Sequence, residues 1–438
     1  MQSAVGAVTV PPAMQLHLRA TASYDAALAR LTDRGDDDLD RVAPAVSEIL
    51  HAVRTRGDEA LGEYSLRYDG AVPSPFAYGP DEMAAALAAL DPSLAEVLRF
   101  SAQRIRAYHE RQVESGLRYT DDDGVGLGWR VRPLSRVGVY APGGKARYPS
   151  SVLMSAIPAA VAGVGEVLLA TPRPTAEILA AASIAGVSRV FDMGGAQAVG
   201  ALAYGTALVP RVDKIVGPGN LYVACAKKLV FGRVAIDGIA GPSEILVVAD
   251  EGADPEAVAA DLLSQAEHDE AAYPLLVATS EAVARRALDA LERQLAELPR
   301  RAIAEASVRA NGHAFVVGDL DEAARVVTAL ASEHLALLVR DPEALLARVG
   351  AAGAAFLGDF TPEAAGDYLA GPSHVLPTGG AVRFSSPLGV YDFVVRTSVI
   401  RYDRDSLGRH GAAIAAFARA EGLEAHARAV EVRLRGGS

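Results

Sequence analysis

Short apolar runs alternate with helical stretches along most of the chain after residue 136. The runs expected to form strands are 136–140, 166–170, 189–192, 213–216 and 244–249, then a second series at 275–278, 314–317, 335–339 and 355–358. Most of them lead through a glycine- or proline-rich turn into a helix. This alternation predicts βαβ units, parallel sheets and an α/β fold of two doubly wound domains.

The two ends of the chain have a different pattern. Residues 1–33 are expected to form a peripheral arm, and residues 36–109 to be helical, with Val42, Val46 and Ile49 on one apolar face. A hairpin is expected over 119–131, and a second one over 385–402 is followed by helices at 411–420 and 423–432. The C-terminal piece has little core of its own, so it should dock onto another surface, such as that of a second subunit.

Composition and charge narrow the class of protein. A chain of 438 residues, half of them hydrophobic, is expected to form two or more globular domains. Its net charge of −12 argues against a nucleic-acid partner, because there is no basic stripe to neutralise phosphates. An enzyme that acts on a small molecule is the better default.

The single cysteine, Cys225, excludes an intrachain disulfide and a cysteine-rich structural zinc site. A bound metal would therefore use histidine, carboxylate and amide ligands. The N-terminus has no basic segment of the secretory type, and Pro158 interrupts the longest apolar run, 151–164. We expect a cytoplasmic protein with no membrane partner.

Glycine-rich segments lie at the ends of several expected strands. They are 141–145, 194–197, 217–220 and 241–244, and ligands of doubly wound sheets collect at the carboxyl ends of the strands. Each segment could equally be a plain tight turn. None matches G-x-G-x-x-G or G-K-[ST], so these segments alone do not establish a nucleotide site.

The segment 254–270 is expected to be a helix that carries half of a metal site. Asp254 and Pro255 are typical of a helix start, and Gln265 and His268 lie on one side of its last turn. Two ligands on one rigid turn suit a metal, but a histidine that interacts with the helix dipole is the simpler alternative.

Two further acid and imidazole pairs stand in conspicuous places. Glu333 and His334 are adjacent at a strand start, which is the composition that acid/base chemistry at neutral pH requires. Asp367 and His374 lie on a loop rich in glycine and proline. A capping aspartate with a solvated histidine would look the same.

Ordered motifs along the chain resemble those of the histidinol dehydrogenase family, which carries out the last two steps of histidine biosynthesis. The resemblance covers 36–434, and its most specific parts are VGVYAPGGKARYPSSVLM, GGAQAVGALAYGT, VDKIVGPGN, AGPSEILVVAD, DLLSQAEHD, SEHLAL, FLGDFTPEAAGDYLAGPSHVLPT and EGLEAHARAV. It implies an NAD-dependent zinc enzyme that works as a domain-swapped homodimer.

The resemblance also implies how the domains divide. Residues 34–139 and 245–388 would form a first incomplete Rossmann-like domain with the metal and catalytic residues. Residues 140–244 would form a second, NAD-binding one. An N-terminal arm, 1–33, and a C-terminal hairpin and helical region exchanged between subunits, 389–438, would be small appendages.

Site residues follow from the same resemblance, position by position. It implies Glu333 and His334 as the catalytic pair. The residues implied to hold zinc are Gln265, His268, Asp367 and, from the second subunit, His426. The residues implied to contact substrate are Ser243, Gln265, His268, Glu333, His334, Asp367, His374, Glu421 and His426. Those implied to contact NAD are Tyr140, Gln197 and Asn220.

The implied reaction takes L-histidinol through L-histidinal to L-histidine and reduces one NAD at each step. His334 suits the base for the alcohol proton, and Glu333 is our choice to activate water in the second step. Three rivals stay open: oxidation of another small polar alcohol, a zinc hydrolase that uses Glu333 and no NAD, and a binding protein without catalysis.

Overall fold

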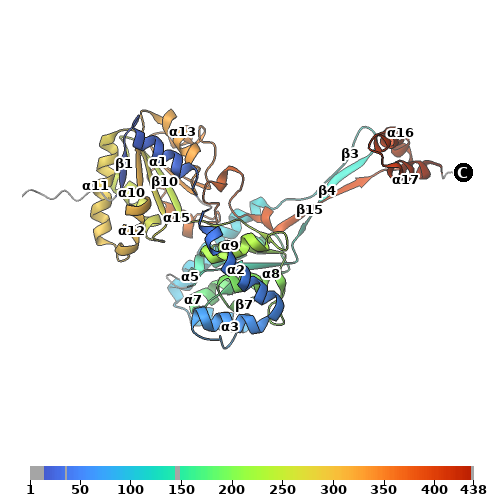
Figure 1. Cartoon of the computed structure of the whole chain (residues 1–438), viewed down its shortest axis with the longest axis horizontal. Helices are drawn as coiled ribbons and strands as arrows, with labels where there is room; N and C mark the ends of the chain where they lie inside the picture. The colour runs from blue at the N-terminus through green and yellow to red at the C-terminus, as the bar shows by residue number, and fades with distance from the viewer. Residues whose placement is uncertain (1–13, 35–36, 144–147, 436–438) are drawn as a thin grey trace, which may run out of the picture.

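The computed structural model describes residues 14–34, 37–143 and 148–435, and it is built around two six-stranded sheets and one three-stranded sheet (Figure 1). We call the large sheets the β10 sheet and the β5 sheet after their central strands. Mixed helices and strands with parallel sheets confirm the expected α/β class.

The β10 sheet is parallel throughout, in the order β1-β12-β11-β10-β13-β14. Its strands are β1 (Gln15–His17), β10 (Glu244–Ala249), β11 (Tyr273–Ala278), β12 (His313–Val316), β13 (His334–Leu338) and β14 (Ala354–Leu357). Its helices are α1 (Ala22–Thr32), α10 (Pro255–Ala266), α11 (Glu281–Glu297), α12 (Arg301–Asn311), α13 (Leu320–Leu330), α14 (Pro342–Leu346) and α15 (Glu363–Tyr368).

Both faces of the β10 sheet are covered, which explains why its strands are nearly all apolar. In β10, Ile245 and Val247 pack with α10, α11 and α12, whereas Leu246 and Val248 pack with α1, α13 and α14. All four side chains are fully buried. The sheet is therefore a rigid layer that holds whatever projects from its ends.

The β5 sheet has the order β2-β7-β6-β5-β8-β9, in which only the edge strand β2 is antiparallel. Its strands are β2 (Ala77–Tyr78), β5 (Arg136–Tyr140), β6 (Glu166–Thr171), β7 (Arg189–Asp192), β8 (Lys214–Val216) and β9 (Ala235–Ile236). Its helices are α2 (Asp37–Arg56), α3 (Asp58–Asp69), α4 (Pro80–Ala89), α5 (Pro92–His109), α6 (Pro149–Val161), α7 (Ala176–Ala185), α8 (Gly195–Tyr204) and α9 (Leu221–Val230).

The packing corrects the expected grouping of residues 34–139 with 245–388. Helices α2 and α3 pack with α8 and α9 on one face of the β5 sheet, while α4 and α5 pack with α6 and α7 on the other. Their apolar stripes show that these helices are buried, but a stripe does not tell which of two similar sheets it covers.

Two more expectations need correction. Residues 15–32 are not peripheral: β1 is the edge strand beside β12, and Tyr24, Ala27 and Leu31 of α1 are buried in the core. Strand β10 belongs between β11 and β13, not beside β8. The expected arm at 1–13 and part of the loop 141–145 lie outside the described residues.

We call each six-stranded sheet, with the helices that pack on it, a body. The remaining segments form an arm that projects far from both bodies, with α16 and α17 at its tip (Figure 1). Its strands β3 (Leu117–Thr120) and β4 (Gly126–Pro133) make the expected hairpin, and β15 (Val394–Arg401) pairs antiparallel with β4. The segment 385–402 is thus a single strand after a short 3-10 turn (Val390–Phe393), not a hairpin of its own. Helices α16 (Arg404–Ala420) and α17 (Glu424–Arg435) pack against each other.

Candidate functional site

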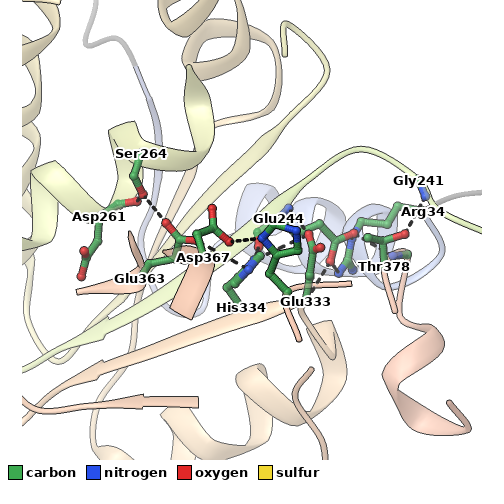
Figure 2. A network of polar contacts seen from close by, with 12 residues as sticks. Arg34, Gly241, Glu244, Asp261, Ser264, Glu333, His334, Glu363, Asp367 and Thr378 are labelled. Atoms are coloured by element: carbon green, nitrogen blue, oxygen red, sulfur yellow. Dashed lines mark hydrogen bonds and ion pairs between the residues drawn. The ribbon is translucent and has the colours of Figure 1, made fainter. Parts of the chain in front are cut away.

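Glu333 and His334 stand at the amino end of β13, in the short turn that follows α13. His334 is the first residue of β13 and pairs with Ile245 of β10, so the pair lies beside Glu244 at the start of β10 (Figure 2). Central parallel strands are the best-ordered elements of such a fold, and residues at their ends are held with little freedom.

The hydrogen bond from the His334 ring defines its tautomer. Nδ1 lies 2.9 Å from the carbonyl oxygen of Glu244, and because a carbonyl can only accept, Nδ1 carries the proton. Burial lowers the pKa of His334 below its usual value, so the ring is neutral at pH 7. Its Nε2 lone pair is then available to take up a proton.

Glu333 is held by its neighbour as well. Its Oε2 accepts the backbone N–H of Glu244 at 2.9 Å and lies 3.6 Å from Nδ1 of His334. Burial raises the pKa of Glu333 well above its usual range, and the nearby carboxylates Glu244 and Asp367 act in the same direction. A carboxyl group shifted in this way is a stronger base than an exposed glutamate.

Asp367 and His374 meet across the turn that follows α15. Asp367 Oδ1 is 3.4 Å from His374 Nδ1, and His374 Nε2 is 3.3 Å from the hydroxyl of Ser151. Burial alone would raise the pKa of Asp367, but His374, His334 and His268 outweigh it, so that the pKa lies below its usual value. The carboxylate is charged at neutral pH and can serve as a ligand.

Gln265 is the residue whose surroundings most clearly call for a ligand. Its side chain is 1% exposed, yet neither its oxygen nor its nitrogen has a hydrogen-bond partner among the described residues. A buried amide without a partner destabilises the folded state by the full cost of its desolvation, about 1–3 kcal/mol, unless a ligand binds it. The amide oxygen is a suitable metal ligand.

His268 lies two residues beyond the end of α10, whose start at Asp254 and Pro255 is as expected. Burial lowers its pKa, although the charge of Asp367 opposes this, so the imidazole is neutral and able to bind a metal. The electrostatic influence of Asp367 and His374 places His268 in the same cluster.

Two buried acids of this cluster were missed by sequence reasoning. Glu363 Oε1 is 3.6 Å from His334 Nε2, and its Oε2 accepts the hydroxyl of Ser264 at 3.0 Å (Figure 2). Burial, reinforced by the charge of Asp367, raises the pKa of Glu363 to about 8. Burial also raises the pKa of Asp261, to about 6. The spacing of Glu363 four residues before Asp367 was the available signal, since it puts both on one side of a helix.

Glu363 also enlarges the set of groups that could hold a metal. Ligand atoms of His334, Glu363 and Asp367 all lie within 4.8 Å of one another. Together with Gln265 and His268, the cluster offers nitrogen and oxygen donors and no thiolate. This donor set suits zinc in a catalytic rather than a structural site.

Tyr140, Gln197 and Asn220 lie elsewhere, in the β5 sheet: Tyr140 ends β5, and Gln197 and Asn220 follow the carboxyl ends of β7 and β8. The Tyr140 hydroxyl accepts the N–H of Gly195 at 3.1 Å, at the start of α8. Asn220 caps α9 through Oδ1, and Gln197 is buried with its Oε1 unpaired among the described residues. The starts of α8 and α9 both lie at this edge, and helix N-termini are suited to an anionic cofactor.

The other predicted residues lie in two places. Ser243 directly precedes Glu244. Glu421 and His426 are exposed on the arm, at the end of α16 and in α17, and the tip of the arm is remote from the β10 sheet (Figure 1). One chain therefore does not bring Glu421 and His426 to the cluster.

The edge used by the β10 sheet differs from expectation. Glu244, Glu333 and His334 lie at the amino ends of their strands, whereas we expected ligands at carboxyl ends. A cavity of about 340 Å³ does lie at the carboxyl ends of β10 and β13, lined by Asp250, Gly252 and Arg340, but no predicted site residue lines it. Segment 241–244 accordingly belongs to the amino edge of this sheet.

Comparison with known proteins identifies the family of this chain. A sequence model described as histidinol dehydrogenase matches residues 32–434. The chain belongs to the histidinol dehydrogenase family. The enzymes of this family are oxidoreductases, and the matched residues include every predicted site residue.

This chain is similar to individual members of the histidinol dehydrogenase family over nearly their full length. The enzyme of Syntrophotalea carbinolica is 54% identical over 418 residues, covering 94% of this chain and 97% of that protein. The enzyme of Aquifex aeolicus is 52% identical over 408 residues, with 93% and 96% covered. The crystal structure of histidinol dehydrogenase from Elizabethkingia anophelis superposes with a TM-score of 0.90 at 34% identity, covering 97% and 98% of the two chains.

Within residues 14–34, 37–143 and 148–435, every helix is too short or too polar to cross a membrane.

Proposed function

We propose that this chain oxidises L-histidinol through L-histidinal to L-histidine, with zinc and NAD, as the last two steps of histidine biosynthesis in the cytoplasm. The observation that carries the proposal is the neutral His334, whose proton is fixed on Nδ1 and which stands beside Glu333 in a buried cluster of nitrogen and oxygen ligands. Membership of the histidinol dehydrogenase family supports the choice of substrate.

Gln265, His268 and Asp367 would hold the metal, with His426 of a second subunit. The unpaired buried amide of Gln265, the neutral His268 and the charged Asp367 fit this role. When bound, zinc would serve as a template that orients the substrate's nitrogen atoms and polarises its oxygen.

Tyr140, Gln197 and Asn220 would hold NAD, which accepts the hydrides. Tyr140 keeps the first turn of α8 in place, and Gln197 offers an unpaired oxygen. The starts of α8 and α9 would bind the pyrophosphate.

The protons are handled by the two catalytic residues. In the first step, Nε2 of His334 takes the proton of the substrate's hydroxyl group. In the second step, Glu333 removes a proton from the water that adds to the aldehyde. Ser243, His374 and Glu421 would contact the substrate's polar groups, so that its reacting carbon is held against these bases.

The arm supports a shared site. Glu421 and His426 lie at its tip, and Ile400, Phe417 and Val432 on the same arm are 68%, 70% and 56% exposed. Apolar side chains left open on a thin projection favour docking onto a second copy of the chain. We therefore propose a homodimer in which each arm completes the partner's site.

The decisive experiment is to count NADH formed per L-histidinol consumed, first with zinc and then with chelator. We expect two NADH per substrate, lost on chelation and restored by zinc. One NADH would indicate a simple alcohol dehydrogenase, and none would contradict the proposal and redirect the search to other alcohols or to hydrolysis.

A further inference from the structure

Glu244 contacts both catalytic residues through all of its polar groups. Its N–H donates to Glu333 Oε2 at 2.9 Å, and its carbonyl accepts from His334 Nδ1 at 2.9 Å. Its carboxylate accepts the N–H of Glu333 at 3.3 Å. A shift of Glu244 would therefore move both catalytic side chains.

The Glu244 carboxylate is in turn held by Arg34. Arg34 Nε and Nη2 donate to Oε1 and Oε2 at 2.9 and 2.6 Å, which is the bidentate geometry of a strong charged pair. The side chains of Arg34 and Glu244 are only 5% and 1% exposed. The N–H of Gly379 donates a further bond to Oε1, at 2.9 Å (Figure 2 shows Arg34 and Glu244 in line with Glu333).

The partners of Glu244 come from the connections between the two bodies. Arg34 follows α1 of the β10 sheet and precedes α2 of the β5 sheet, and Glu244 ends the return from β9 to β10. Gly379 lies in the third connection, which leaves α15 and reaches Leu388 and Phe393 in the core beside the β5 sheet. All three connections are therefore joined at one carboxylate.

A purely stabilising role does not explain this arrangement. A buried ion pair gains little stability over apolar residues of similar volume, because desolvation offsets most of the attraction. The Arg34–Glu244 pair nevertheless lies next to Glu333 and His334, and Glu244 is hydrogen-bonded to both of them. Holding Glu333 and His334 in a fixed geometry is the role that fits these contacts.

We propose that Arg34 and Glu244 are positioning residues that hold Glu333 and His334 in a fixed place relative to the connections between the two bodies. The proposal rests on the proposed function, since it assigns the pair to the chemistry of Glu333 and His334. Neither Arg34 nor Glu244 needs to touch the substrate.

The test compares Glu244→Gln with Asp392→Asn. Asp392 is the matched control, because it too accepts from a cation, Lys214 at 2.7 Å, and from a backbone N–H, Gly389 at 3.0 Å, without touching the catalytic pair. In Glu244→Gln we expect kcat to fall about 100-fold, as a displacement of about 1 Å at reacting groups costs. The KM for NAD should change by less than about twofold, because the NAD site lies on the other sheet.

Arg34→Lys is the second variant, because it keeps the charge and loses the fork. We expect an intermediate loss, about tenfold in kcat, with a folded protein as judged by circular dichroism. This variant decides the matter if Glu244→Gln does not fold. An unchanged kcat in Arg34→Lys, or an equal loss in Asp392→Asn and Glu244→Gln, would overturn the proposal.

Crystal structures of the variants separate this proposal from the proposed function. We expect His334 and Glu333 to be displaced in Glu244→Gln and unmoved in Asp392→Asn. That comparison needs no turnover, so it decides the positioning role even if wild-type protein forms no NADH from histidinol. Undisplaced side chains in Glu244→Gln would count against positioning.

Discussion

Glu333 and His334 are neighbours in the chain, yet their surroundings push them toward different tasks. The backbone carbonyl of Glu244 fixes the His334 tautomer, and burial keeps that ring neutral while it raises the pKa of Glu333. Two bases with different proton affinities suit two successive proton transfers. The composition of the pair was readable from the sequence, but these environments depend on β10, which lies far away in the chain.

Replacing Glu333 with Gln should separate the two oxidation steps. Without the carboxylate, water addition to the aldehyde loses its base, and general-base catalysis contributes about 10²–10⁴-fold. The first oxidation depends on His334 and should slow much less. A single-turnover experiment should then give close to one NADH per L-histidinol.

Asp250→Asn is the control for this measurement. Asp250 also binds backbone N–H groups, at the opposite end of β10. It should keep two NADH per substrate. If Glu333→Gln also gave two at the normal rate, Glu333 would not be the base.

At the scale of elements, the strands were predicted closely and their partners were not. The expected strands 136–140, 189–192 and 244–249 match β5, β7 and β10 residue for residue. Periodicity is a local property, which is why it locates a strand. Membership of a sheet depends on contacts across hundreds of residues, so β10 was placed with the wrong neighbours and β1, of three residues, was missed.

The same limit applies to the site. Glu244 and Glu363 looked like ordinary acids because their importance comes from burial, at 1% exposure each, which the sequence does not show. Gln265 and His268 share one local segment, so they could be proposed together from the sequence, although His268 lies beyond the end of α10 and not on its last turn. The cluster of His268, His334, Glu363 and Asp367 required the fold.

The contact between β1 and β12 should make stability sensitive to mild acid. His17 Nε2 is 2.8 Å from His313 Nδ1, and Arg30 lies against the other ring nitrogen, at 2.7 Å. Burial, with the charges of His17 and Arg30, lowers the pKa of His313 from 6.5 to about 4. Between these values the unfolded chain binds more protons than the folded one. The contribution of His313 to the free energy of unfolding is therefore fully present above pH 6.5, and it is lost as the pH drops toward 4.

From pH 7 to pH 5 this group should remove about 2 kcal/mol from the free energy of unfolding. Urea unfolding of metal-free protein at both pH values measures the loss. His313→Asn should show a smaller loss by about that amount, whereas the exposed control His51→Asn should behave like wild type. Equal pH dependence in all three proteins would contradict this role for His313.

At the scale of the molecule, the arm is the feature that a single chain does not explain. It places Glu421 and His426 away from the cluster that they are proposed to complete (Figure 1). A site made from two chains gives a prediction that single-chain sites do not share, because defects on the two sides can complement each other.

Mixing Glu333→Gln with His426→Asn subunits should restore activity. A mixed dimer has one site with both defects and one intact site, so equal mixing should give about a quarter of wild-type activity if subunits assort at random. Activity is measured here as L-histidine formed, and each variant alone should form almost none. Subunits are mixed in denaturant and refolded, and recovery of no activity would exclude shared sites.

The pairing of β1 with β12 has a consequence for how the protein is made. His17 and its partner His313 are 296 residues apart, so β1 leaves the ribosome long before the strand it joins. At about 5–20 residues per second, the delay is roughly 15–60 s. All six strands of the β5 sheet are made during that time, whereas the body with Glu333 and His334 must await the last third of the message. Termination before His313 would then yield a chain that has every strand of the β5 sheet but lacks β12, β13 and the pair Glu333 and His334.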